Sequence, residues 1–372
     1  MADWYVDYVN GNDANSGLTT LLPKKTIQAA VNLATKRDVF NLANTGNHVL
    51  AAPLSFTTGF TNTGSGWVVF KSWDNGGSET TQRPDEAAPR VAALLDGLDL
   101  ITGSLAFAPP PVVFRDIKLT NFTSVPADPY GGGPLIMDGC EIYGQSGTQW
   151  VVITRGSGWY SRCYVHSNTT VQTPLVLNDG NTAFFRYGWI ESSGSSAIIA
   201  MDNNNSAFGN VIKVLSAGVS VLGITNNQGD LFGNTIVANG LVNQKIFSAS
   251  ASNIGKVYNN VVRGFNGTGS KPIDMTGTSI AYILGKNAYY DCNANTFNPE
   301  GLVGLDLTSE DIYASGDPFV DSANGDYTLN DTVGAAAKAA GLGNYNSYVD
   351  MGAVQSAAGG GGGSNDVFIV NE

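Results

Sequence analysis

Six side chains between residues 141 and 191 combine groups that bind sugars with groups that can move protons. They comprise two carboxylates, three aromatic rings and an imidazole, and they recur at a nearly constant interval in two parallel series: Glu141, Tyr164, Trp189, and Tyr143, His166, Glu191. Aromatic faces suit the C–H faces of sugar rings, and carboxylates accept hydrogen bonds from hydroxyl groups. The set predicts a glycan-binding surface. The alternative is a subunit contact, because Tyr and Trp are also enriched at interfaces.

Catalysis by the same set is a weaker interpretation. If each series marks one position on successive turns of a coil, Glu191 lies one turn from His166, and a histidine–carboxylate pair becomes geometrically feasible. Glu141 and Glu191 would then be about 11–12 Å apart. That separation exceeds the roughly 6.5–9.5 Å needed by an inverting pair of carboxylates.

A second set consists of Arg155, Asp179 and Asp202, which follow one another at nearly the same interval. On neighbouring turns the two aspartates would lie about 5 Å apart, which suits a retaining carboxylate pair or a Ca²⁺ site. We therefore name these three residues as catalytic candidates, with Ca²⁺ as the single cofactor considered. The alternative is turn chemistry, because Asp179 precedes Gly180 and Asp202 precedes Asn203.

The interval belongs to a repeat that must position both sets. Four segments share an asparagine at a fixed offset, namely Asn210, Asn234, Asn260 and Asn287, followed two positions later by Ile212, Ile236, Val262 and Tyr289. We extend this apolar slot upstream through Ile117, Cys140, Cys163 and Gly188, and place a second apolar column at Val152, Val176, Ile199, Leu222, Ile246 and Ile273. Both columns repeat with one shared period in the twenties. Such a period, with short β-branched runs and Gly/Asn turns, predicts a β-solenoid.

The two ends of the chain are expected to close this solenoid. Residues 3–9 alternate as a strand does, and residues 26–34 place apolar side chains at Ile27, Ala30, Val31 and Ala34, which is helical spacing. A short amphipathic helix is predicted there. It would cover the exposed core at the first turn, as terminal caps of repeat proteins do.

These end segments resemble a known family. Trp4-Tyr-Val-Asp7, Asn10-Gly-Asn-Asp13, Ser16-Gly17 and Lys25-Thr-Ile-Gln-Ala-Ala30 are similar to the N-terminal cap of pectin-lyase-like right-handed parallel β-helix proteins. Asp317-Pro-Phe-Val320, Gly325-Asp-Tyr-Thr-Leu329 and Asp350-Met-Gly-Ala-Val354 are similar to the closing segment of bacterial and phage members. The resemblance implies a single-stranded right-handed parallel β-helix over residues 3–355. It covers lyases, hydrolases, adhesins and virion spikes, and its lyases use acidic Ca²⁺ ligands beside a basic residue.

Composition narrows the possible partners. The net charge of −12 argues against nucleic acid and against anionic membranes, and the absence of a long apolar run argues against a membrane span. Three cysteines are too few for a disulfide framework, and Cys140 and Cys163 are expected to be stacked core thiols. The chain opens without a recognisable secretory signal, so we expect folding in a cytoplasm.

We divide the chain into five parts: an N-terminal cap (1–40), a parallel β-helix (41–300), a closing segment (301–355), a glycine-rich linker (356–364) and a tail (365–372). The tail contains the β-prone run Val367, Phe368, Ile369 and Val370. Tethered by a flexible linker, this run is expected to dock on a partner by adding a strand to a sheet edge.

Together these features predict a non-enzymatic phage virion surface protein, such as a capsid decoration, head spike or tail spike. It would form a homotrimer, attach to a capsid or tail protein through its C-terminal tail, and bind a host surface glycan. Two alternatives stay open. One is a polysaccharide lyase or glycoside hydrolase that uses Asp179 and Asp202, or Glu191 with His166. The other is a secreted bacterial adhesin.

Overall fold

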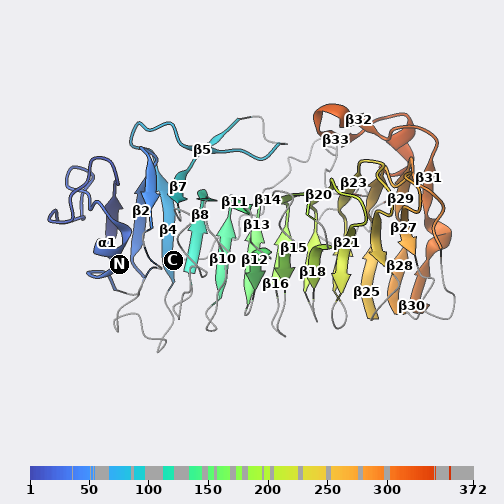
Figure 1. Ribbon diagram of the computed structural model, residues 1–372, viewed down its shortest axis with the longest axis horizontal. Helices are drawn as coiled ribbons and strands as arrows, with labels where there is room; N and C mark the ends of the chain where they lie inside the picture. Colours follow the sequence, from blue (N-terminus) through green and yellow to red (C-terminus); the bar gives the residue numbers. More distant parts are fainter. Residues whose placement is uncertain are drawn as a thin grey trace.

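The computed structural model of the chain is a solenoid of short strands, and its described residues cover most of the coil (Figure 1). The structure describes residues 1–35, 37–50, 52, 54, 67–84, 88–96, 112–120, 134–144, 150–154, 157–167, 173–177, 183–194, 197–201, 205–224, 229–248, 253–274, 280–296, 302–338, 340 and 352. Arg155, Asp179, Asp202 and the tail residues Val367–Val370 lie outside these ranges.

Three parallel sheets form the walls of the coil in the described part of the chain. The first sheet has 12 strands: β1 (Asp3–Val6), β2 (Val39–Ala43), β4 (Val68–Trp73), β8 (Val112–Arg115), β10 (Leu135–Asp138), β13 (Gly158–Ser161), β16 (Ala183–Arg186), β19 (Ser206–Phe208), β22 (Asp230–Phe232), β25 (Asn253–Tyr258), β28 (Ile280–Gly285) and β30 (Leu302–Leu307). The second sheet has 11 strands: β3 (Asn47–Val49), β7 (Ala93–Asp96), β9 (Ile117–Thr120), β11 (Glu141–Gly144), β14 (Tyr164–Ser167), β17 (Trp189–Ser192), β20 (Val211–Val214), β23 (Thr235–Ala238), β26 (Val261–Arg263), β29 (Ala288–Tyr290) and β31 (Ile312–Ala314). The third sheet has six strands: β12 (Trp150–Thr154), β15 (Thr173–Leu177), β18 (Ala197–Met201), β21 (Ser220–Ile224), β24 (Lys245–Ser248) and β27 (Lys271–Asp274).

The chain visits the sheets in turn, so each strand pairs with the strand one coil later in the sequence. β11, for example, pairs in parallel with β14, and β14 with β17. Parallel strands joined by such crossovers coil in the right-handed sense. The fold is therefore a right-handed parallel β-helix, the architecture of pectin-lyase-like proteins, and the predicted fold class is confirmed.

Alternation along each short strand fills the interior of the coil. In the second sheet Leu119, Ile142, Val165, Ile190 and Ile212 are fully buried at the middle of their strands. Their neighbours on either side point outward because successive side chains of a strand alternate between faces. Each short strand thus contributes one or two core side chains and a similar number of outward ones, which is how the second sheet positions the candidate site.

One corner of the coil, between the first and second sheets, is built the same way on many turns. Its bend is made by a residue with φ between 52° and 67°, which is Asp116, Gly139, Arg162, Tyr187, Gly209, Gly233, Asn259 or Lys286. The next position holds the asparagines singled out in the sequence. The backbone N–H of Asn210 donates to Asn234 Oδ1 (3.0 Å), and the N–H of Asn234 donates to Asn260 Oδ1 (2.9 Å).

This asparagine ladder continues to an acidic residue. Asn260 N–H donates to Asn287 Oδ1 at 3.0 Å, and Asn287 N–H donates to Asp311 Oδ1 at 2.9 Å. Each asparagine also donates its side-chain N–H to a backbone carbonyl of the preceding turn, as Asn234 does to Ala207 (2.9 Å). The ladder therefore satisfies buried backbone and side-chain groups together, which gives the asparagine column a scaffold role.

The strand register corrects two predicted columns. Ile190 pairs with Ile212, so Gly188 stands two positions earlier, in line with Asn210, whose Oδ1 accepts from the Gly188 N–H (2.8 Å). The upstream residues Ile117, Cys140, Cys163 and Gly188 thus continue the asparagine column and not the column of Ile212. In the third sheet Val176 pairs with Ala200, and Leu222 pairs with Phe247, so two members of that predicted column, Val176 and Ile246, were one position out of register.

The N-terminal cap contains the predicted helix in a shorter form. Helix α1 (Ile27–Val31) begins after Thr26, whose hydroxyl accepts from the Ala29 N–H (3.2 Å), and Ile27, Ala30 and Val31 are buried. The helix ends at Val31, and Leu33 just beyond it is exposed. The Asp38 carboxylate then accepts from the Thr35 backbone (2.8 Å) and the Trp4 indole (3.0 Å).

Two short antiparallel hairpins lie outside the coil among the described residues, both on the same side of the molecule (Figure 1). The first pairs β5 (Thr80–Thr81) with β6 (Arg90–Val91). The second pairs β32 (Phe319–Asp321) with β33 (Asp326–Leu329). Short 3₁₀ turns accompany the closing segment: η3 (Thr308–Glu310), η4 (Ser322–Asn324) and η5 (Val333–Ala336).

Candidate functional site

The outer face of the second sheet carries the six residues that the sequence grouped. Glu141 pairs with Tyr164 and Tyr164 with Trp189, while Tyr143 pairs with His166 and His166 with Glu191. The two series therefore occupy successive positions on β11, β14 and β17. The expected stacking is correct because the corner before each of these strands has the same length.

Glu141 anchors the first half of the face. Its Oε1 accepts from His166 Nε2 at 3.1 Å and lies 3.2 Å from Lys118 Nζ on β9. Its Oε2 accepts from the hydroxyl of Thr81 on the first hairpin (3.1 Å). Burial alone would raise the pKa of Glu141, but the hydrogen bonds from His166 and Lys118 hold the pKa below its usual value. The carboxylate is therefore ionised at neutral pH.

Glu191 anchors the second half in the same manner. Its Oε1 accepts from the Trp189 indole at 2.8 Å and from Lys213 Nζ on β20 at 3.0 Å, and its Oε2 accepts from the Tyr164 hydroxyl at 3.1 Å. Burial opposes ionisation, yet the hydrogen bonds from Lys213 and Trp189 lower the pKa of Glu191 below its usual value. Both carboxylates of the face thus stay charged and act as acceptors.

Three rings lie between the two carboxylates. The Tyr164 and His166 rings are stacked, with centroids 4.2 Å apart and planes 5° apart, and the Tyr143 ring lies 4.7 Å from His166 at 36°. Burial and the charge of Glu191 raise the pKa of Tyr164 well above its usual value, so its hydroxyl group remains a donor. We call the eight residues of this surface the outer-face network: Lys118, Glu141, Tyr143, Tyr164, His166, Trp189, Glu191 and Lys213.

The pairing of the histidine differs from the sequence hypothesis. We expected His166 beside Glu191, but its Nε2 contacts Glu141, one turn on the other side. Glu191 is instead occupied by Trp189, Lys213 and Tyr164. Side chains on a sheet lean along as well as across the strands, so register alone does not select between two neighbouring carboxylates.

Exposure was also mispredicted for two of the six residues. Glu141 is buried under the first hairpin, and Trp189 is completely buried under the second. The Tyr327 ring lies 5.7 Å from the Trp189 ring, and Lys213 Nζ lies 5.0 Å from the same indole. Alternation predicts the face of the sheet to which a side chain points, but it does not predict whether a distant segment folds over that face.

Sequence reasoning missed four contributors to this site: Lys118, Lys213, Thr81 and Tyr327. A signal for the two lysines was present, since Lys118 stands one repeat interval before Glu141 and Lys213 one interval after Glu191. Extending each series by one turn would have found them. Thr81 and Tyr327 come from the hairpins and carry no periodic signal.

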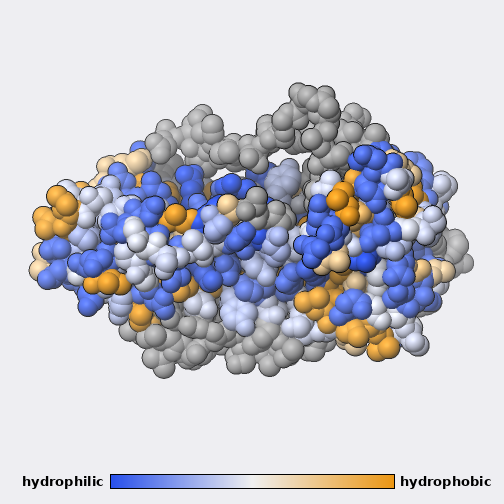
Figure 2. Space-filling model, turned by 90° about the horizontal axis from the view of Figure 1, so that it is seen from above, coloured by the Kyte–Doolittle hydropathy of each residue, from blue (hydrophilic) through white to orange (hydrophobic). Residues whose placement is uncertain are grey.

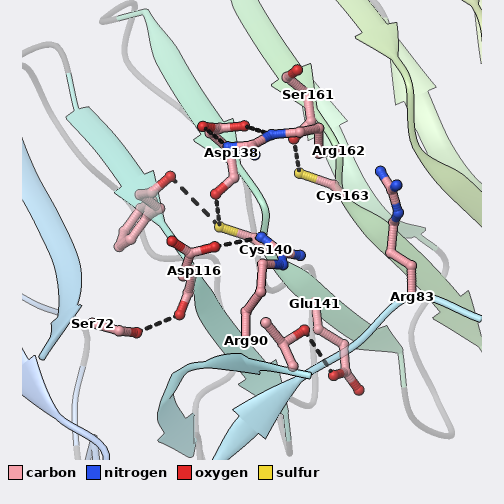
Figure 3. Close-up of polar contacts among 12 residues, drawn as sticks. Ser72, Arg83, Arg90, Asp116, Asp138, Cys140, Glu141, Ser161, Arg162 and Cys163 are labelled. Carbon is pink, nitrogen blue, oxygen red and sulfur yellow. Dashed lines mark hydrogen bonds and ion pairs between the residues drawn. The ribbon is translucent and has the colours of Figure 1, made fainter. Parts of the chain in front are cut away.

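The corner beside the network holds a cluster of ion pairs and thiols (Figure 3). Arg90 of the first hairpin binds Asp116, and Arg162 Nε binds Asp138 at 2.8 Å. Burial raises the pKa of Asp116 although Arg90 opposes this shift. Arg83 donates to the backbone carbonyl of Tyr187, so the first hairpin follows this corner from β9 to β17.

The thiols in this corner do not resemble nucleophiles. Cys140 and Cys163 are buried and unpaired, as the sequence predicted, and Cys140 Sγ points to the backbone carbonyl of Phe114 (3.6 Å). Burial raises the pKa of the Cys140 thiol well above its usual value, which disfavours the reactive thiolate.

His48 is equally buried, and its Nε2 contacts the Ala43 carbonyl at 2.8 Å, in keeping with a structural role.

The described part of the chain has neither a cluster of metal ligands nor a membrane-spanning helix. Among the described residues, His, Cys, Asp and Glu side chains form no group of three that could hold a metal ion. The catalytic and Ca²⁺ candidates Arg155, Asp179 and Asp202 fall outside those ranges and stay predictions. Within the described ranges, each helix is too short or too polar to cross a bilayer.

Comparison with proteins of known structure shows a similarity of fold. No protein-family model matches the sequence, and neither does a curated protein. The structure is similar to pectate lyase Pel9A (15% identity, TM-score 0.46, covering 95% of this chain and 96% of that one). It is also similar to a rhamnogalacturonan lyase (11% identity, TM-score 0.38, covering 89% of this chain and 95% of that one). A third similar structure is the GH136 lacto-N-biosidase from Eubacterium ramulus (11% identity, TM-score 0.35, covering 84% of this chain and 68% of that one). Because these identities and TM-scores are low, the fold is assigned from the sheet topology and not from the similarity to these structures.

Proposed function

We propose that this right-handed parallel β-helix binds carbohydrate on the outer face of its second sheet. The observation that supports the proposal is the outer-face network. It holds two ionised carboxylates and three rings in fixed register on β11, β14 and β17. Glu191 and the three rings are partly exposed, and Glu141 is buried. Groups fixed on a rigid ladder are pre-organised, so little conformational entropy is lost when a ligand binds.

The charges of the network favour a neutral sugar. Glu141 is paired with Lys118 and His166, and Glu191 is paired with Lys213, so the face has no large excess of either sign. The chain as a whole carries a net charge of −12, which repels polyanions. Ionised carboxylates accept hydrogen bonds from hydroxyl groups, and the partly exposed edges of Tyr143 and Tyr164 offer apolar contact.

We propose binding and not cleavage, because the protonation states oppose hydrolysis. A glycoside hydrolase needs one carboxylic acid whose pKa is raised enough to protonate the leaving oxygen. Glu141 and Glu191 both have lowered pKa values, so neither provides that proton at neutral pH.

A specific contact favours the enzymatic alternative. Glu141 orients the His166 imidazole through Nε2 at 3.1 Å, which is how a carboxylate positions a general base. Incubation with a panel of neutral and uronic-acid polysaccharides, followed by assays for new reducing ends and for unsaturated products, tests this alternative. Product formation that is lost in His166→Ala would replace binding by catalysis. The lyase set Arg155, Asp179 and Asp202, with Ca²⁺, is tested in the same assay by adding Ca²⁺ or a chelator.

Binding itself is tested on a printed array of neutral oligosaccharides, followed by calorimetry with the bound sugars. Tyr143→Ala should weaken binding about two- to tenfold, because one ring contact is worth about 0.5–1.5 kcal/mol. Trp159→Ala is the matched control, since Trp159 is an exposed ring on the first sheet, away from the network. An array without a bound sugar, or a loss of binding in Trp159→Ala but not in Tyr143→Ala, would refute the site.

The finer biological proposal is display on a phage virion. It is supported by the acidic composition, the glycine-rich linker 356–364 and the β-prone run Val367–Val370 in the sequence. In this proposal the protein is a homotrimer that attaches to a capsid or tail protein through the tail and presents the β-helix to host glycans. Mass spectrometry of purified virions tests the location, and deletion of residues 356–372 tests attachment. Particles that retain the truncated protein would contradict the tail's role, and detection at a bacterial surface would favour the adhesin alternative.

A further inference from the structure

The two hairpins that lie over the outer face of the second sheet are held by different kinds of contact. The second hairpin packs on apolar side chains, because its Phe319, Tyr327 and Leu329 are buried in one cluster with Trp189 and Val211 of the sheet. Such packing is lost only when several large side chains return to water together. The second hairpin is therefore a fixed part of the fold.

The first hairpin lies along the polar part of the same face. Its described residues, 78–84 and 88–91, contain no buried apolar side chain, and among them Thr81 alone is buried. Figure 2, which looks down on the side that carries both hairpins, shows hydrophilic residues prevailing in the middle of the molecule. Segments with few buried apolar contacts open at a low cost in free energy, so the first hairpin belongs to the least stable part of the cover.

Polar contacts hold the first hairpin along the face from β9 to β17. Its two arginines bind the neighbouring corner, one at the carboxylate of Asp116 and the other at the backbone carbonyl of Tyr187. Between these two points, the Thr81 hydroxyl donates to Glu141 Oε2 at 3.1 Å. Water can replace contacts of this kind, because polar groups that separate become solvated.

The base of the first hairpin is anchored more firmly than its far end. Asn44 Oδ1 accepts from the backbone N–H groups of Asn75 (3.0 Å) and Gly77 (3.1 Å), and a Cβ on Gly77 would lie 1.9 Å from the Asn44 carbonyl oxygen. On the returning arm, the Ala92 N–H donates to the Glu79 carbonyl at 3.1 Å. A fixed base and a far end held by polar contacts allow the hairpin to lift from the face as a flap.

Thr81 places a hydroxyl group on the acceptor that a ligand would use. His166 Nε2 and Lys118 Nζ lie 3.1 Å and 3.2 Å from Glu141 Oε1, and the Thr81 hydroxyl donates to Oε2. An aliphatic hydroxyl group that donates to an ionised carboxylate is the same contact that a sugar hydroxyl makes. The closed hairpin therefore satisfies the Glu141 carboxylate with one of its own side chains.

We propose that the first hairpin is a self-inhibiting lid, and that a carbohydrate binds by taking the place of the Thr81 hydroxyl on Glu141 Oε2. This inference rests on the proposed function and adds the regulation of the same site. With the lid closed, Tyr143, His166 and Glu191 are partly exposed and Glu141 is buried. With the lid open, Glu141 joins them as an acceptor. The apparent affinity for the sugar then depends on the fraction of molecules whose lid is open.

Thr81→Val tests the lid, because it keeps the shape of the side chain and removes the hydroxyl group. Binding is measured with the full-length protein on the array of neutral oligosaccharides and then by calorimetry. We expect Thr81→Val to bind about tenfold more tightly than the wild type, since loss of a hydrogen bond to a charged acceptor favours the open lid. Unchanged or weaker binding by Thr81→Val would overturn the lid and leave carbohydrate binding intact.

Two further variants separate the hydroxyl group from other effects. Thr80→Val is the matched control, because Thr80 is an exposed residue of the same strand, and it should bind like the wild type. Thr81→Ser retains a hydroxyl group and should keep the wild-type affinity within about threefold. Tighter binding by Thr80→Val or Thr81→Ser, equal to that of Thr81→Val, would also overturn the lid.

Hydrogen exchange followed by mass spectrometry tests the opening without a ligand. The paired amides of β5 and β6 should exchange about tenfold faster than those of β32 and β33, and faster again in about 1 M salt, which screens the ion pair of Arg90 with Asp116. Equal protection of the two hairpins would overturn the lid. An array on which neither the wild type nor Thr81→Val binds would overturn the proposed function, and exchange would then still decide whether the hairpin opens.

Discussion

The acidic end of the asparagine ladder gives a sharp prediction. Asp311 occupies the position that asparagines fill on the preceding turns, and its Oδ1 accepts from the Asn287 N–H at 2.9 Å. Its Oδ2 is buried without a hydrogen-bond partner among the described residues. In the ladder this second atom is an amide nitrogen that donates to a backbone carbonyl, as Asn260 does to Leu231 (3.1 Å). A protonated carboxyl group can imitate that donor, and a carboxylate cannot.

The surroundings of Asp311 favour the protonated form. Burial raises its pKa to about 7, and the negative charge of Asp306 adds to the effect, whereas the hydrogen bond from Asn287 opposes it. Tyr289 and Tyr313 face the same carboxyl group and stay neutral, since burial raises the pKa of each phenol. The ion pair of Lys286 with Glu310 (3.6 Å) lies on the neighbouring turn. The folded protein therefore holds a proton here that the unfolded chain releases near pH 4.

The sign and size of the effect follow from this difference. A carboxyl group whose pKa is raised by folding lowers stability as pH increases from the unfolded pKa to the folded one. The gap between about 7 and the usual 3.8 corresponds to about 4 kcal/mol at full effect. Because the side chain is partly exposed and solvent screens it, we expect about 2 kcal/mol. Stability should fall between pH 4 and pH 7 and then become independent of this group.

The perturbation is Asp311→Asn, which supplies the amide donor at every pH. Urea unfolding and thermal melts between pH 4 and pH 9 should show the variant about 2 kcal/mol more stable than the wild type at pH 8, and equally stable near pH 4. Asp326→Asn is the matched control, because Asp326 is an exposed carboxylate on the second hairpin and does not contribute to the pKa shift of Asp311. Parallel stability curves for the wild type and Asp311→Asn would refute the reasoning.

Three further predictions concern the network, its cover and the core. Glu191→Gln should weaken sugar binding by about tenfold, since a charge-assisted acceptor becomes neutral, and calorimetry beside Trp159→Ala would show it. Trp189→Ala should cost about 3–5 kcal/mol of unfolding free energy in urea, and a cost below about 1 kcal/mol would mean that the second hairpin does not bury this ring. Cys140 should resist a disulfide exchange reagent in the folded protein and react on unfolding, and rapid reaction in the native state would contradict its burial.

The sequence predicted those parts of the fold whose physical cause is local and repeated. The asparagine column was correct because each amide must meet the turn before it, which imposes one period on the whole ladder. Gly188 was assigned to the wrong column because small and apolar residues replace asparagine upstream, and a glycine carries no pattern. In the third sheet Val176 and Leu175 are adjacent apolar residues, and only the backbone pairing shows that Leu175 aligns with Ile199.

The candidate site was predictable in its register but not in its contacts. The alignment of Tyr143, His166 and Glu191 follows from counting along the chain. The choice of Glu141 as the partner of His166 depends on side-chain direction and on Lys118, which the count left out. The burial of Trp189 depends on Tyr327, which comes several turns later in the chain, and no local pattern of Trp189 reports a contact at that range.

The second hairpin also has a mechanical consequence. A solenoid without such a cover can unravel one turn at a time from its end, because each turn contacts only its neighbours. Here the closing segment folds back over β17, β20, β23, β26 and β29, with Gly352 N–H bonded to the Asn259 carbonyl (3.1 Å). If the last turn is pulled away under tension, the closing segment must first detach from all five strands at once. The C-terminal third of the coil should therefore resist force and proteases as one block, and give way in a single step.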